Sequence, residues 1–211
     1  MENYKKTPLD PNCVENEINY FLKNVDVIGC CKKMVDDLNK RLLSTKDDYD
    51  FFSSLFTGKT IGGFVDNHLV KILNEKSDLL WRHGNDQTEV DMVCEQNHRV
   101  SFEMKTSSQE RYDKYGSLVK IDIPFSKTNA GNMDGCSRKY KMDKYDYCLF
   151  MQYHMPKDFN DKFKILRVYV GMYRPSDLST YNDGYQNCSS ARLPVYIFRD
   201  QFRLIYGVPE H

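Results

Sequence analysis

The chain has 211 residues, and its 30 Lys and Arg balance 30 Asp and Glu, so the formal net charge is zero. Hydrophobic residues make up 40% of the chain and aromatic residues 13%, which fits one globular domain with a sizeable core and excludes a fibrous or disordered protein. Zero net charge argues against a protein that coats nucleic acid without regard to sequence, but it leaves the distribution of charge open.

The sequence lacks the features of a membrane or exported protein. Its longest apolar runs, such as Cys148 to Met151, are far shorter than the ~20 residues that a membrane span needs, and charges are scattered through the N-terminal region. The 7 cysteines are an odd number without CxxC spacing, which indicates neither a disulfide framework nor a zinc site. We therefore expect a cytoplasmic protein without a membrane partner.

Helical periodicity dominates residues 1–60. Apolar residues recur on one helical face over Val14–Asn24 and again from Ile28 to Leu42. A third helix is predicted over Phe64–Asn74, after a break at Gly62 and Gly63.

Beyond this helix the periodicity changes to two, which predicts strands. The predicted strands are Glu89–Cys94, Val100–Lys105, Leu118–Ile123, Tyr145–Tyr153 and Ile165–Tyr173, with two short apolar runs at Pro194–Phe198 and Phe202–Tyr206. Phe125 to Lys144 lacks periodicity and is predicted to be a long loop. We expect an α/β fold of the α+β kind, in which helices precede a mixed sheet, and a single domain over residues 1–211.

Two neighbouring predicted strands carry the most informative pattern. Alternation along Glu89–Cys94 and Val100–Lys105 places apolar side chains on one face of each strand and charged side chains on the other. The polar residues between them are typical of a turn, so the strands are predicted to form a hairpin with one apolar and one charged face.

The register of this hairpin decides which charges meet. If the turn is centred on Asn97, paired residue numbers sum to 194, so Asp91 faces Glu103 and Glu89 faces Lys105. Carboxylates about 5 Å apart repel each other, so either the register differs, one carboxyl group is protonated, or a cation lies between them. A divalent metal resolves the conflict best, and Mg²⁺ suits such hard oxygen ligands.

Lys105 adds a cation to the same face, two residues after Glu103. An ammonium group beside a metal and a phosphate can orient an attacking water and stabilise developing negative charge. The combination is typical of phosphodiester hydrolysis. The alternative is a solvated hairpin face with an ion pair between Glu89 and Lys105.

Asp91, Glu103 and Lys105 together resemble the PD-(D/E)XK nuclease superfamily. The resemblance implies that Asp91 and Glu103 hold Mg²⁺, for which Mn²⁺ can substitute, and that Lys105 positions or activates the attacking water. Val90 stands where the family usually has a proline. Asp66, on the helix before the hairpin, occupies the place of the family's helical acid and is a third candidate metal ligand; the alternative is an exposed polar residue.

A closer resemblance is to type II restriction endonucleases of the ScaI-like kind, over about residues 60–195. It is carried by the segments Phe102–Ser108, Tyr145–Phe150, Val170–Asp177 and Ala191–Leu193. It implies a restriction-endonuclease-like core over residues 61–211, a mixed central sheet flanked by helices, preceded by the helical segment 1–60. It also implies a homodimer that cleaves double-stranded DNA at a short, palindromic sequence.

Such an enzyme must hold phosphates and read base edges. Residues 46–95 contain 5 basic and 10 acidic residues, whereas residues 105–144 contain 9 basic and 5 acidic ones. Candidate DNA-binding residues are hydroxyls that follow Lys105, cations of the long loop, and polar residues of a predicted recognition loop over Tyr181–Arg192: Thr106, Ser107, Ser108, Lys127, Arg138, Lys139, Lys141, Asn182, Gln186, Asn187 and Arg192. Each set is equally compatible with a solvated polar loop.

Two other functions remain open at this stage. A repair, recombination or RNA nuclease without strict sequence preference would use the same fold and site. A non-catalytic nucleic-acid-binding module would carry the charged hairpin face only as a surface network of ion pairs.

Overall fold

The computed structural model describes residues 8–55, 58–85, 89–107, 124–125, 144–174, 177, 179–182, 189–192 and 195–208. The N-terminal part is helical, as the periodicity predicts. After the short 3₁₀ turn η1 (Pro11–Cys13) come α1 (Val14–Asn24), α2 (Val27–Leu42), α3 (Lys46–Leu55) and α4 (Gly58–Lys76).

Local capping explains where the second of these helices begins. The side chain of Asp26 accepts a hydrogen bond from the backbone N–H of Gly29 at 3.0 Å, which satisfies one of the free donors in the first turn of α2. A side chain at residue 29 would collide with the Asp26 carboxylate, so the glycine makes this close cap geometry possible.

The predicted helix break at Gly62 and Gly63 is wrong, because α4 continues through both glycines. A glycine inside a helix costs about 1 kcal/mol relative to alanine. The apolar stripe of the same helix more than offsets that cost: Val65, Leu69 and Ile72 are fully buried against the sheet.

Nine strands form two sheets within the described part of the chain. The large sheet has the order β1-β2-β3-β5-β6-β9, and the small sheet has the order β4-β8-β7. In the large sheet only β3 and β5 are parallel neighbours; the other pairs are antiparallel. The strand bounds are β1 Trp81–His83, β2 Met92–Cys94, β3 Phe102–Ser107, β4 Pro124–Phe125, β5 Asp146–His154, β6 Lys164–Tyr173, β7 Ser179–Asn182, β8 Ser189–Arg192 and β9 Phe202–Gly207.

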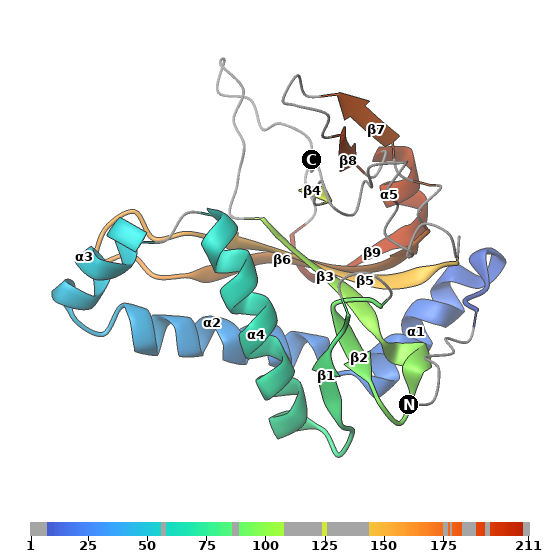
Figure 1. The fold of residues 1–211 in the computed structure, drawn as a ribbon, viewed down its shortest axis with the longest axis horizontal. Coiled ribbons are helices and arrows are strands. Elements are labelled where there is room, and N and C mark those ends of the chain that lie inside the picture. The colour runs from blue at the N-terminus through green and yellow to red at the C-terminus, as the bar shows by residue number, and fades with distance from the viewer. Residues whose placement is uncertain are drawn as a thin grey trace.

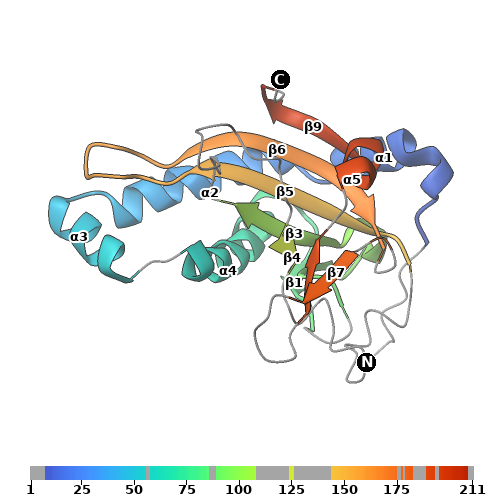
Figure 2. The same ribbon diagram turned by 90° about the horizontal axis from the view of Figure 1, so that it is seen from above.

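Helices cover the two faces of the large sheet unequally (Figure 1). α1, α2 and α4 pack on one face and enclose the main hydrophobic core, whereas the short helix α5 (Val195–Gln201) lies on the other face. There it covers a second cluster formed by Cys148, Phe150, Tyr169 and Tyr173. The small sheet lies on this second side (Figure 1), and the view from above shows its strand β4 next to β3 (Figure 2).

The structure confirms the predicted fold class, a mixed sheet flanked by helices. The predicted helix over Val14–Asn24 is reproduced residue for residue, and the predicted strands over Tyr145–Tyr153 and Ile165–Tyr173 correspond to β5 and β6. The predicted strand Leu118–Ile123 and the interior of the predicted long loop lie outside the described residues.

Two predictions about the C-terminal third are wrong. The apolar run Pro194–Phe198 was predicted as a strand, but residues from Val195 onward form α5, whose Ile197 and Phe198 pack on the second cluster. The pattern of a short apolar run is the same for a buried strand and for a buried helical turn. Here the packing of the run on the second cluster favours the helix. The stretch predicted as a polar recognition loop also contains strands, because β7 and β8 form an antiparallel pair.

Two properties bear on the predicted environment. Among the described residues, no helix combines the length and apolar character required to cross a membrane. The five described cysteines are free thiols; Cys13 is exposed and Cys30, Cys31, Cys94 and Cys148 are buried.

Candidate active site

The predicted hairpin forms between β2 and β3, in the predicted register. Met92 pairs with Phe102, and their residue numbers sum to the predicted 194. Between the strands, the chain makes the 3₁₀ turn η2 (His98–Val100). All six predicted apolar residues are buried: Val90, Met92, Cys94, Val100, Phe102 and Met104. Val93 and Glu103 are buried too, so the hairpin is covered on both faces.

The charged residues of β3 lie on the face of the sheet opposite to α1 and α2. Glu103 pairs with Cys148 and Lys105 with Phe150 in the parallel register of β3 and β5, and both of these partners belong to the cluster under α5. Asp91 immediately precedes β2 and reaches across to the same place.

Asp91, Glu103 and Lys105 come together as the sequence predicts. The Lys105 Nζ lies 2.6 Å from Glu103 Oε1 and 3.4 Å from Asp91 Oδ2. The same Asp91 oxygen accepts a hydrogen bond of 3.0 Å from the backbone N–H of Met104. The aspartate is therefore bound to β3 through both a main-chain group and the lysine.

Burial makes this ion cluster strongly coupled. The side chain of Glu103 is 1% exposed, that of Lys105 12% and that of Asp91 26%. Burial by itself would lower the pKa of Lys105, but the negative charges of Glu103 and Asp91 outweigh it and raise that pKa above its usual value. The lysine is thus protonated at neutral pH. Its ammonium group provides a positive charge next to both carboxylates, which reduces the repulsion between them.

The donor set also fits a divalent metal. Two adjacent carboxylates, one of them partly open to solvent, are sufficient for Mg²⁺, which retains several water ligands and is commonly held by one or two carboxylates. Within the described ranges there is no group of three or more His, Cys, Asp or Glu side chains placed to hold a metal ion. Asp66 lies on α4, and its side chain is outside the described part of the structure.

Glu89 does not take the predicted place opposite Lys105. The strand β2 begins only at Met92, and the Glu89 carboxylate binds Arg82 through two hydrogen bonds of 2.7 and 2.8 Å. The guanidinium group of Arg82 also binds Glu95, so it joins two carboxylates along the hairpin. Hydrogen bonding to Arg82 lowers the pKa of Glu89. The alternative ion pair between Glu89 and Lys105 is therefore replaced by a neighbouring pair.

Sequence analysis missed the strand that holds Asp91 from the other side. β1 pairs with β2, and just beyond it the backbone N–H of Gly84 donates a hydrogen bond of 2.9 Å to the carbonyl oxygen of Asp91. A Cβ at residue 84 would lie 1.7 Å from the carbonyl oxygen of Val90, so only glycine permits this approach. The signal in the sequence was Gly84, directly after the short stretch Trp81–His83.

The predicted DNA-binding residues are only partly described. Thr106 lies within β3 and pairs with Met151 of the main core. It is therefore on the face covered by α1, α2 and α4, not on the face of Lys105. Ser107 ends β3, Asn182 ends β7, and Arg192 ends β8, next to β4. The other predicted residues lie outside the described ranges: Ser108, Lys127, Arg138, Lys139, Lys141, Gln186 and Asn187.

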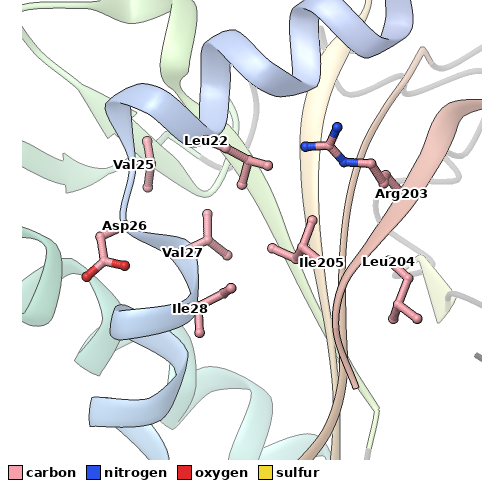
Figure 3. Close-up of a pocket in the computed structure, with 8 residues that line it drawn as sticks. All are labelled: Leu22, Val25, Asp26, Val27, Ile28, Arg203, Leu204 and Ile205. Atoms are coloured by element: carbon pink, nitrogen blue, oxygen red, sulfur yellow. The ribbon is translucent and has the colours of Figure 1, made fainter. Parts of the chain in front are cut away.

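A hollow of about 350 Å³ lies elsewhere, between the corner of α1 and α2 and the edge strand β9 (Figure 3). Leu22, Val27 and Ile205 point into it. Its polar groups are already engaged, since Asp26 caps α2 and Arg203 binds Glu15 at 2.7 Å. The hollow lies beside α1 and α2, away from the face that carries Glu103 and Lys105.

Comparison with known proteins adds no relative: no family model, curated protein or solved structure matches the chain. The geometry of the site is therefore the main basis for a functional proposal.

Proposed function

We propose that the protein is a Mg²⁺-dependent nuclease of the PD-(D/E)XK type, and specifically a type II restriction endonuclease that hydrolyses double-stranded DNA at a short, palindromic sequence. The observation that carries the proposal is the convergence of Asp91, Glu103 and Lys105, with the lysine ammonium within 3.4 Å of both carboxylates. A buried cluster of two acids and one base on adjacent strands is a costly arrangement for structure alone.

In the proposed mechanism Asp91 and Glu103 hold the metal. Bound there, Mg²⁺ would polarise a phosphoryl oxygen and lower the pKa of a bound water. Lys105 donates hydrogen bonds to the attacking water or to a phosphate oxygen, which orients the nucleophile and stabilises the negative charge that develops on phosphorus oxygens. The backbone N–H of Met104 keeps Asp91 oriented during these steps.

The neighbourhood of the site suits a long, charged substrate. Asp91 is the more exposed of the two carboxylates, so the site opens on its side. The small sheet adjoins β3, and its strands β7 and β8 carry the positions of Asn182 and Arg192. Arginine and asparagine side chains form bidentate hydrogen bonds with base edges in the major groove. A two-fold homodimer would present two such sites to a palindrome.

Cleavage of DNA tests the proposal. Purified protein incubated with several DNAs and Mg²⁺ is expected to yield discrete fragments, and Asp91→Ala is expected to abolish them. The matched control is Asp36→Ala, which removes an exposed aspartate from α2 and should cleave like the wild type. A ladder or smear would instead indicate a nuclease without sequence preference, and undiminished cleavage by Asp91→Ala would refute the assignment of the site.

A non-catalytic binding module is the second candidate. The observation in its favour is that Lys105 already pairs with both carboxylates, as expected for a structural ion cluster. Titration calorimetry with Mg²⁺ and Mn²⁺ separates the two proposals. Metal binding that is lost in Asp91→Ala supports the nuclease, whereas absence of binding, together with absence of cleavage, supports the module.

A further inference from the structure

A tyrosine of β6 shares the face of the carboxylate site. In the sheet, Glu103 pairs with Cys148, and Cys148 pairs with Gly171 of β6. Tyr173 is two residues beyond Gly171, opposite Asp146, and therefore points to the same side as Glu103. Neighbouring strands are about 4.8 Å apart, so Glu103 and Tyr173 belong to strands about 10 Å apart.

The residues between them are small enough for the two side chains to approach. In the row of Glu103, Cys148 is the only side chain between β3 and β6, because Gly171 contributes none. Tyr173 is one row further along β6, opposite Asp146, so the two side chains meet diagonally. The ring of Phe202 takes the space over Gly171, where an added Cβ would lie 2.3 Å from it. Tyr173 is 7% exposed and packs in the same cluster as Cys148, the strand partner of Glu103.

The hydroxyl group of Tyr173 lies in the field of the site. Burial raises its pKa first, and the negative charges of Glu103, Asp146 and Asp91 raise it further. The phenol is therefore protonated, and it is a hydrogen-bond donor in a negative, desolvated environment. A buried tyrosine hydroxyl normally finds an acceptor. Asp146 is directly opposite Tyr173 in the sheet, but among the carboxylates that act on the phenol Glu103 has the largest effect.

We propose that Tyr173 is a positioning residue of the site and that its hydroxyl orients the Glu103 carboxylate for metal binding. This inference rests on the proposed function and identifies a residue that the acid and lysine motif does not contain. Glu103 is held by Lys105 at 2.6 Å. A lysine that turns to a phosphate releases this contact, and a neutral donor from β6 then keeps the carboxylate in place.

Removal of a single oxygen atom tests the proposal. In Tyr173→Phe the ring and its packing remain, but the donor is lost; Tyr173→Met removes the donor in a second way. Tyr153→Phe is the matched control, since Tyr153 is 2% exposed and faces the main core on the opposite side of the sheet. For each protein, Mg²⁺ affinity is measured by titration calorimetry and stability by urea denaturation in EDTA.

Loss of an outer hydrogen bond to a metal ligand weakens metal binding or activity roughly 10–100-fold. We expect this loss of Mg²⁺ affinity in both Tyr173 variants and wild-type affinity in Tyr153→Phe. If the Tyr173 variants are less stable but bind Mg²⁺ like the wild type, while Asp91→Ala does not bind it, the positioning proposal is refuted and the nuclease proposal stands. If the wild-type protein binds no metal, both proposals fail.

Discussion

Replacement of Lys105 by methionine gives the sharpest test of the ion cluster. Methionine keeps much of the side-chain volume but leaves two carboxylates facing each other without a counter-charge. At an effective dielectric constant of ~20, Coulomb attraction of the ammonium is about 6 kcal/mol to Glu103 and about 5 kcal/mol to Asp91, from distances of 2.6 and 3.4 Å. Desolvation of the buried ions offsets much of this, so we expect a net loss of stability of about 3–5 kcal/mol.

Divalent metal should rescue this variant. With the ammonium absent, a metal ion has no internal competitor for the carboxylates, so excess Mg²⁺ should stabilise Lys105→Met more than the wild type. Saturation at a hundred times Kd is worth about 2.7 kcal/mol for any protein that binds only when folded. Urea denaturation in EDTA and in Mg²⁺ measures both effects.

The control for this experiment is Lys164→Met, which removes an exposed lysine from β6 and should change neither quantity. Two results would refute the reasoning. Wild-type stability of Lys105→Met in EDTA would show that the lysine does not neutralise buried charge. Equal response of wild type and Lys105→Met to Mg²⁺ would show that metal and lysine do not compete for the same carboxylates.

Three further predictions concern the scaffold. Glu17 is 5% exposed, and although burial opposes the shift, its pKa is lowered because Arg99 and other donors bind it at distances down to 2.7 Å. Glu17→Gln should lower the free energy of unfolding by about 1.5–3 kcal/mol near neutral pH. This difference should vanish as the pH falls below ~4, because a group with a lowered pKa stabilises the fold only while it is ionised. Gly84→Ala should lower the free energy of unfolding by more than the ~1 kcal/mol typical of point mutants, and it should reduce cleavage. Stability and cleavage are both measured on the purified variant. Burial raises the pKa of Cys30 to about 11, so peptide mapping after alkylation at neutral pH should find Cys13 modified and Cys30 protected; equal labelling would contradict the burial of Cys30.

The helices and the hairpin that carries the candidate site were predictable because their signals are local. The period of the apolar residues locates α1 from Val14 to Asn24, and alternation along β2 and β3 separates the face that joins the main core from the face of Glu103 and Lys105. The polar turn between them then sets the register, and the observed pair of Met92 with Phe102 follows. Each of these steps depends on residues close in the sequence.

The parts that were not predicted depend on packing between distant segments. Gly62 and Gly63 indicate a break only when the buried stripe that follows them in α4 is ignored. Val195 and its neighbours become helical because Ile197 and Phe198 cover a cluster whose members come from β5 and β6. Tyr173 is seventy residues from Glu103 in the sequence, and only the sheet order places both on one face.

The position of Lys105 also changes how the conflict between the carboxylates is understood. Sequence analysis left three solutions: another register, a protonated carboxyl group or a cation. The predicted register is present, and a cation lies between the acids, but it belongs to the chain itself. Because an internal ammonium stabilises the pair, the metal-free protein does not depend on a metal for the stability of this site. The same contacts keep the lysine away from any substrate. In the proposed nuclease, Lys105 would act on a phosphate only after these contacts are released, and Asp91 and Glu103 would release them if they held a metal instead.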